Sequence, residues 1–270
     1  MINDINAFEN CAKENGVRYW SSIEYKNILG YETDASFNNV INKAMGVCVN
    51  LNIQIPDAFS PHTFDVDGVT KSGYKLSRFA CFLIAMMADE KKPAVAEARV
   101  YLAAFASVCV DEQESLDDMV RLEIRNELKQ AEKSLATVAI GAGLPRSMIA
   151  LFKDEGFRGM YNMRSKALKS KRGLDMKGIL YDYMGQTELA GNFFRVTQTV
   201  ERIKNNKIQG QQKLNQTAYK VGKEVRNMMT QDGGSKPELL PQEDHIKEST
   251  KRLKGANREM KKIDKPKKKK

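Results

Sequence analysis

The sequence predicts an α+β fold in which strands are confined to the first part of the 270-residue chain and helices make up the rest. Two observations carry this prediction. Residues 63–70 alternate polar and apolar side chains around Asp67-Gly68, a pattern typical of a β-hairpin. From Leu116 onward, apolar residues recur at helical spacing, and strand-like alternation is not seen up to Pro237.

The first predicted element is a pair of short helices joined by a tight turn. Ser21 and Glu24 have the spacing of a capping box, which would start the first helix. Gly30 suits the left-handed position that ends a helix. The apolar residues of the second helix share one face: Phe37, Val40, Ile41, Ala44, Met45 and Cys48. The pair therefore predicts a helix-turn-helix-like unit.

A loop, a hairpin and two further helices complete the first predicted domain. Residues 53–62 contain two prolines and indicate a loop, which the hairpin of residues 63–70 follows. The next helix carries a buried stripe that includes Phe79 and Leu83. Pro93 suits the first turn of another helix, where a missing amide costs nothing, and this helix closes the domain near residue 110.

The rest of the chain divides into three regions. We expect residues 111–140 to form a long connecting helix, because Gly141–Pro145 interrupts the helical pattern. Residues 141–240 are expected to form a helical C-terminal domain, in which the clearest helix covers about 187–205. Residues 241–270 are a basic tail that we expect to be disordered.

The formal net charge of +10 belongs almost entirely to the tail. Residues 247–270 contain 12 of the 44 Lys and Arg residues and 3 of the 34 Asp and Glu residues, which gives +9. The other 246 residues carry only +1. The basic composition thus describes the tail, which either adds salt-sensitive attraction to phosphates or serves as a solubilising terminus.

Ordered sequence blocks resemble known families. Tyr19–Tyr31 and Lys75–Asp89 resemble the Bro-N domain, a DNA-binding module of phages, bacteria and large DNA viruses. Later blocks resemble the DNA-damage-inducible protein D family, and they are Leu128–Leu135, Gly156–Tyr161, Met184–Thr199, Val221–Arg226 and Pro237–Pro241. The resemblance covers the chain up to the tail. It implies a Bro-N-like N-terminal domain, a helical C-terminal domain and expression induced by DNA damage, but it does not imply a mechanism.

The chemistry of an enzyme is largely missing from the sequence. The two histidines, His62 and His245, lie far apart, so neither a His-based triad nor a metal cluster is evident. We therefore expect no catalysis, no metal and no cofactor. Asp65 and Asp67, with Glu90 and a nearby lysine, leave a metal-dependent nuclease as a third hypothesis, although the two aspartates also suit a turn.

The cysteines and the hydropathy pattern bear on where the protein works. The four cysteines are far apart, which favours free thiols in a reducing cytoplasm over disulfides. No run of about 18 apolar residues predicts a membrane span. We expect a cytoplasmic protein that does not bind membranes.

Two groups of polar residues are candidates for contacts with nucleic acid. Asparagine and lysine suit base edges and phosphates, and the first group lies near the helical pair and the hairpin: Lys26, Asn38, Asn39, Asn42, Lys43, Lys71, Lys75 and Arg78. The second group lies in the C-terminal domain: Arg158, Arg164, Lys166, Lys169, Lys171, Arg172, Arg195 and Arg202. Tyr161 and Tyr181 flank this stretch and could stack on bases. Ordinary solvated helix faces explain both groups equally well.

These features favour a protein of the DNA-damage response that binds DNA, single- or double-stranded, without catalysis. The family's association with damage-induced expression adds a RecA-type recombinase filament on single-stranded DNA as a candidate partner. The alternative is a protein-binding regulator or inhibitor of a mobile element, antitoxin-like or anti-defence. The near-neutral charge outside the tail supports this alternative, since a dedicated duplex binder usually has a strongly basic face.

Overall fold

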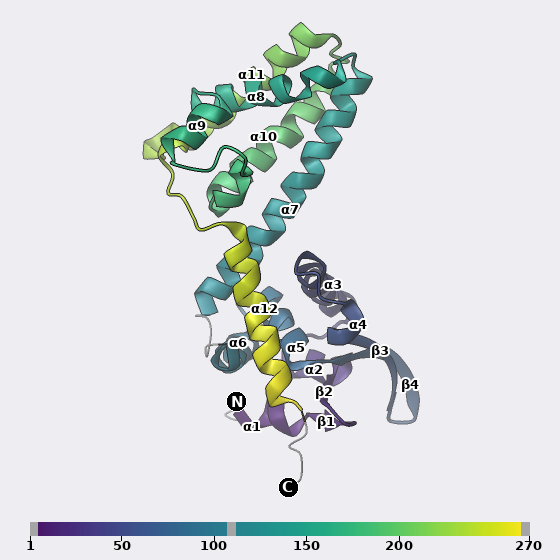
Figure 1. Cartoon of the computed structure of the whole chain (residues 1–270). Coiled ribbons are helices and arrows are strands. Elements are labelled where there is room, and N and C mark those ends of the chain that lie inside the picture. The colour runs from purple at the N-terminus through teal and green to yellow at the C-terminus, as the bar shows by residue number, and fades with distance from the viewer. Residues whose placement is uncertain (1–4, 107–111, 266–270) are drawn as a thin grey trace. The chain divides into compact units, whose positions relative to one another are not determined.

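The computed structural model describes residues 5–106 and 112–265 and divides into two compact units (Figure 1). The first unit comprises Met1–Met119 together with Glu248–Lys270, and the second unit comprises Val120–Lys247. The first unit contains a four-stranded antiparallel sheet, and the second is helical, which confirms the predicted α+β class. In the described parts of the chain, no helix is both long and apolar enough to cross a membrane.

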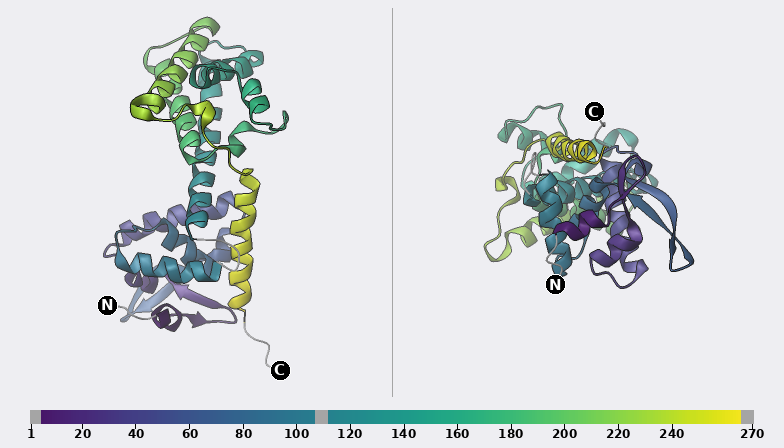
Figure 2. Two further views of the ribbon diagram at one scale, coloured as in Figure 1. Left: turned by 90° about the vertical axis from the view of Figure 1, so that its left-hand side faces the viewer. Right: turned by 90° about the horizontal axis from the view of Figure 1, so that it is seen from below.

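The sheet of the first unit has the strand order β1-β2-β4-β3. Its strands are β1 (Lys13–Glu14), β2 (Arg18–Ser21), β3 (Phe59–Val66) and β4 (Val69–Leu76). The β3–β4 hairpin turns at Asp67 and Gly68, whose φ angles of 54° and 76° are those of a two-residue turn. The closed end of this hairpin extends beyond the rest of the unit (Figures 1 and 2).

The hairpin is confirmed, but it is longer than the sequence indicated. Residues 59–62 pair with β4 as part of β3, so the loop predicted over 53–62 is wrong for these four residues. Proline is tolerated here because β3 is an edge strand, where a missing amide breaks no ladder on the open side. Residues 55–58 form the short helix α4 (Ile55–Ala58).

The predicted helical pair is present as α2 (Ser22–Ile28) and α3 (Asp34–Asn50). Gly30 has a φ of 70°, which confirms its left-handed role after α2. The predicted capping box is wrong: Ser21 precedes α2 without a side-chain cap, and Glu24 instead accepts from Lys13 Nζ at 2.6 Å. Ser21 also ends β2, where it pairs with Lys75 and is buried, so its hydroxyl is not presented to the helix.

The core of the first unit surrounds α5 (Arg78–Met87), in which nine residues from Arg78 to Met86 are buried. Two other helices of this unit are α1 (Ile5–Asn10) and α6 (Pro93–Ala106), and Pro93 begins α6 as expected. Trp20, the single tryptophan, stacks on Phe8 with ring centroids 4.5 Å apart. Its indole Nε1 donates to the Phe8 carbonyl at 2.8 Å, so its polar atom is satisfied inside the core.

The C-terminal tail contains the helix α12 (Ile246–Ile263), so the expected disorder is wrong for these residues. Leu253, Ala256 and Met260 follow helical spacing and are buried. Both views show α12, in yellow, lying along the first unit (Figure 2). Because the segment is highly charged, this narrow apolar stripe is hard to recognise in the sequence. Lys267–Lys270, for which disorder was also expected, lie outside the described residues.

A buried charge cluster centred on Arg78 ties α12 to α5 and α1. Arg78 is 1% exposed, and its Nε and Nη2 donate to Asp264 Oδ1 at 2.9 and 2.8 Å. Arg78 Nη2 also donates to Glu9 Oε2 at 3.1 Å. Burial raises the pKa of Asp264, and the hydrogen bonds from Arg78 offset this only in part. The prediction that Arg78 contacts nucleic acid is wrong, because its side chain points into this cluster.

The second unit is an assembly of helices that begins within α7 (Glu112–Gly141), the long helix expected over 111–140. It continues with α8 (Ile149–Tyr161), α9 (Ser165–Lys171), α10 (Gln186–Asn205) and α11 (Gln211–Thr230). The helix predicted over 187–205 is confirmed as α10. Glycines let α8 and α11 approach closely: a Cβ on Gly159 would lie 2.9 Å from the Lys223 amide nitrogen, and one on Gly222 2.9 Å from that of Met160.

We predict that Asp264→Asn destabilises the first unit by about 2–4 kcal/mol, because it leaves the buried Arg78 without one of its two carboxylates. Urea unfolding followed by the fluorescence of Trp20 reports on this unit. The matched control is Asp57→Asn, which removes a half-exposed pairing between α4 and Lys261 of α12 and should change stability by less than about 0.5 kcal/mol. Equal effects of the two substitutions would contradict the cluster's role.

We predict that Gly159→Ala or Gly222→Ala destabilises the second unit by on the order of 2 kcal/mol or more, because the new methyl group collides with the backbone of the facing helix. Hydrogen exchange of the α8 and α11 amides measures the effect. Gly255→Ala in α12 is the control, since a Cβ there meets nothing within 4 Å. It should stabilise by about 0.5–1 kcal/mol through helix propensity.

Candidate nucleic-acid interface

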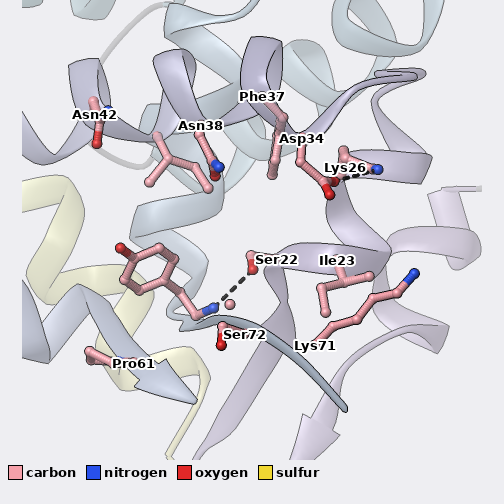
Figure 3. A pocket seen from close by; sticks show the side chains of 13 residues that line it. Ser22, Ile23, Lys26, Asp34, Phe37, Asn38, Asn42, Pro61, Lys71 and Ser72 are labelled. Carbon is pink, nitrogen blue, oxygen red and sulfur yellow. Dashed lines mark hydrogen bonds and ion pairs between the residues drawn. The ribbon is translucent and has the colours of Figure 1, made fainter. Parts of the chain in front are cut away.

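A groove of about 710 Å³ lies in the first unit between the helical pair and the β3–β4 hairpin. One wall consists of residues from α2 and α3, and the other of Pro61 from β3 and residues 71–74 of β4. Figure 3 shows Asn38 and Asn42 on the helical wall and Lys71 and Ser72 on the strand wall. Phe37 and Ile41 are lining residues whose side chains are otherwise buried, so α3 anchors its wall in the core.

A direct contact between α2 and β4 holds the two walls at a fixed separation. The Tyr74 amide donates to Ser22 Oγ at 2.9 Å, although β4 is 52 residues away along the chain (Figure 3). A Cβ on the neighbouring Gly73 would lie 2.6 Å from the same oxygen. A side chain at position 73 would therefore either displace β4 from α2 or turn the Ser22 hydroxyl away and break its bond to the Tyr74 amide.

Four of the residues predicted to contact nucleic acid meet in this groove. They come from three elements: Lys26 from α2, Asn38 and Asn42 from α3, and Lys71 from β4. Asn38, Asn42 and Lys71 are exposed, whereas Lys26 is partly covered and donates to Asp34 Oδ1 at 2.7 Å. The convergence rests on the pairing of β2 with β4 and on the Ser22–Tyr74 contact, and no spacing in the sequence reveals either of them.

The remaining members of the first predicted group lie outside the groove lining. Asn39 and Lys43 are exposed on α3, next to the lining residues in sequence. Lys75 is partly buried, with its Nζ 4.8 Å from the centroid of the Tyr19 ring. Arg78 is inside the core, as described above.

Asp34 is a groove residue that the sequence analysis missed. Its side chain is 81% exposed, and the hydrogen bond from Lys26 holds the pKa of its carboxyl below the ordinary value, with a smaller contribution from the charge of Lys71. The carboxylate is therefore ionised at neutral pH. It partly cancels the charge of the two lysines and opposes the approach of an anion. It is the first residue of α3, where an acid is common whether or not it has a further role, so its position in the sequence gives no signal for the groove.

The groove is open and polar, and it offers several kinds of hydrogen-bonding group. Asn38 and Asn42 each carry a donor and an acceptor, Ser72 a hydroxyl, and Lys71 an ammonium group. Such a set can pair with a phosphate and with the edge of a base at the same time. The arrangement is therefore able to bind a polar, anionic chain.

The second predicted group does not form one surface. Arg172 donates to both oxygens of Glu188 at 2.9 and 3.1 Å, and Arg195, 1% exposed, donates to Asn192 and to the Tyr181 hydroxyl. Nucleic-acid contact by Arg172 and Arg195 is therefore a wrong prediction. Both arginines point into the helical assembly, where burial raises the pKa of Glu188 against the lowering effect of Arg172.

The two tyrosines expected to stack on bases are also occupied. Tyr161 is buried and donates to Glu188 Oε1 at 2.7 Å, and the Tyr181 hydroxyl donates to Glu132 at 2.9 Å. A signal for this polar interior exists in the sequence: Glu188, Asn192, Arg195 and Thr199 recur every three or four residues, beside the apolar stripe of α10. This spacing is that of a second buried stripe.

The other arginines of the second group are paired at the surface. Arg158 contacts Glu155 at 2.6 Å, Arg164 contacts Asp154 and Glu155, and Arg202 forms a fork with Glu224. Lys169 donates to the Met176 carbonyl at 3.0 Å. Lys166 and Lys171 are exposed and form no ion pair with the described residues.

The residues of the nuclease hypothesis have local partners. Asp65 Oδ1 accepts from the Gly68 amide at 2.8 Å and so stabilises the hairpin turn, while Glu90 lies 3.5 Å from Arg99. Across residues 5–106 and 112–265, no group of three or more His, Cys, Asp or Glu side chains could hold a metal ion. Cys11, Cys48 and Cys81 are free thiols, and Cys109 lies outside the described residues.

Comparison with known proteins gives two matches. Residues 116–249 match the model of a family described as the DinD C-terminal domain, a range that nearly coincides with the second unit, Val120–Lys247. The chain is also 34% identical, over 239 residues, to DNA damage-inducible protein D of Escherichia coli strain K12. This alignment covers 84% of the chain and 87% of that protein.

Proposed function

Since the chain belongs to the DNA damage-inducible protein D family, we propose that it acts in the DNA-damage response by binding DNA, without catalysis, in the groove between α2–α3 and β3–β4. Its place of action in this proposal is the cytoplasm. The convergence of Lys26, Asn38, Asn42 and Lys71 on one groove supports the proposal. These residues come from elements up to 45 positions apart in the sequence, so local patterning does not explain their meeting.

In this proposal the two walls have different tasks. Lys71 neutralises a phosphate, and the amides of Asn38 and Asn42 reach base edges or sugar oxygens. Asn39 and Lys43 continue the polar face of α3 beyond the groove and extend the contact along the strand. The resulting affinity is modest and sensitive to salt, because few phosphates are neutralised and Asp34 opposes them.

A protein ligand is the second candidate. The body outside residues 247–270 carries a charge of only +1, and several of its surface arginines are paired with carboxylates. A recombinase filament on single-stranded DNA would present both a nucleic acid and a protein surface to one chain. A regulator of a mobile element would require only the protein contact.

We predict opposite effects of two substitutions on DNA binding, measured by fluorescence anisotropy with single- and double-stranded oligonucleotides at low salt. Lys71→Glu should weaken binding about tenfold, since it places a negative charge beside the phosphate. Asp34→Asn should strengthen binding severalfold, since it removes a repulsive charge and releases Lys26.

The control has the same charge change as Lys71→Glu but lies elsewhere. Lys129 is exposed on α7 in the second unit, and Lys129→Glu should leave affinity nearly unchanged. A chain ending at Lys265 separates the contribution of the terminal lysines. Absence of binding to either kind of oligonucleotide, or equal weakening by Lys71→Glu and Lys129→Glu, would refute binding in the groove.

A further inference from the structure

A separate surface of the second unit combines exposed cations with exposed apolar side chains. It is formed by α9 and the following loop, residues 173–179, and we refer to Lys166, Lys171, Met176, Lys177 and Ile179 as the α9 surface. Met176 and Ile179 are 49% and 54% exposed. Large apolar side chains at such exposure, three positions apart and next to lysines, resemble the anchors of an interface more than a solvated loop.

The loop that presents Met176 and Ile179 has a defined conformation. Lys169 Nζ donates to the Met176 carbonyl at 3.0 Å and also to that of Gly178. The Lys177 amide donates to Asp175 Oδ1 at 3.0 Å, and the Gly178 amide donates to the Asp175 carbonyl at 3.1 Å. The two apolar side chains are thus held outward by hydrogen bonds at their own backbone, which lowers the entropic cost of binding a partner.

The charge of this surface calls for an acidic partner. Residues 164–179 contain six Lys and Arg residues and one acidic residue, Asp175. Arg164, Lys169 and Arg172 are used in internal contacts. Lys166, Lys171 and Lys177 remain exposed and form no ion pair among the described residues, although the charge of Lys171 also acts on the carboxylate of Glu238.

The chemistry of the exposed apolar residues decides whether the ligand of the α9 surface is a nucleic acid or a protein. Sequence-independent binding of a single strand uses aromatic rings on which bases stack. Tyr161 and Tyr181, which flank the surface in the sequence, are committed to Glu188 and Glu132, and the ring of Tyr183 packs edge-on against His245. What the surface presents instead is a thioether and a branched aliphatic chain, which pack against apolar side chains of a protein.

We infer that the α9 surface is a docking site for an acidic segment of a partner protein that carries apolar anchors. Carboxylates of the segment pair with Lys166, Lys171 and Lys177, and its apolar side chains pack on Met176 and Ile179. This site is independent of the groove in the first unit, and it does not rest on the binding of DNA there.

Selection from a phage-displayed library of random peptides on the full-length chain tests the inference. We expect enriched peptides in which Asp or Glu alternates with apolar residues, and a synthetic copy of one of them serves as the anisotropy probe. Met176→Ser with Ile179→Ser should weaken its binding about tenfold, and so should Lys166→Glu with Lys171→Glu and Lys177→Glu. Salt should weaken binding to the wild-type chain.

Two controls make single substitutions of the same kinds elsewhere on the surface. Val100→Ser alters an apolar residue that is 65% exposed on α6, and Lys129→Glu alters an exposed lysine on α7; both should leave peptide binding unchanged. A single-stranded oligonucleotide should not displace the peptide. The inference is overturned if no acidic peptides are enriched, if the α9 variants bind them as the wild type does, or if the oligonucleotide competes at this surface. If Lys71→Glu abolishes DNA binding but leaves peptide binding intact, this result bears only on the proposal that DNA binds in the groove, and not on the α9 surface.

Discussion

The hydrogen bond from the Tyr74 amide to Ser22 Oγ is the contact on which the candidate interface depends. It joins the helical pair to the hairpin, and the glycine at position 73 allows the strand to come this close. Together with the pairing of β2 and β4, it fixes Lys71 of the hairpin opposite the helix that carries Asn38 and Asn42. Four elements, α2, α3, β3 and β4, thereby line one groove whose two walls carry different functional groups.

In both units, the arginines and the lysines among the predicted contact residues have different environments. The six arginines predicted to contact nucleic acid pair with carboxylates or are buried, and they are Arg78, Arg158, Arg164, Arg172, Arg195 and Arg202. Among the residues predicted to contact nucleic acid, the exposed cations that form no ion pair with the described residues are lysines, such as Lys71, Lys166 and Lys171. The forked guanidinium group suits two-point contacts with carboxylates, so it is used internally, whereas the hydrated ammonium group stays at the surface. The near-neutral charge of the body therefore coexists with two cationic surfaces.

Local signals in the sequence were sufficient to predict turns, helix ends and the apolar face of a helix. The Asp67-Gly68 turn, the left-handed Gly30, the start of α6 at Pro93 and the stripe of α10 were all predicted correctly. Prediction failed where a distant contact decides the outcome. Ser21 does not cap α2 because β4 pairs with it, and Arg78 faces inward because α12 returns with Asp264. The groove belongs to this second kind, and so the sequence supplied its residues without their arrangement. The Bro-N resemblance of the first unit stays a prediction.

Binding of DNA in the groove is best tested by an NMR titration of the isotope-labelled full-length chain with short oligonucleotides. We expect the largest amide shift changes at Lys26, Asn38, Asn42 and residues 71–73, on both walls of the groove. Changes confined to the second unit or to residues 246–265, with the groove amides unmoved, would contradict it.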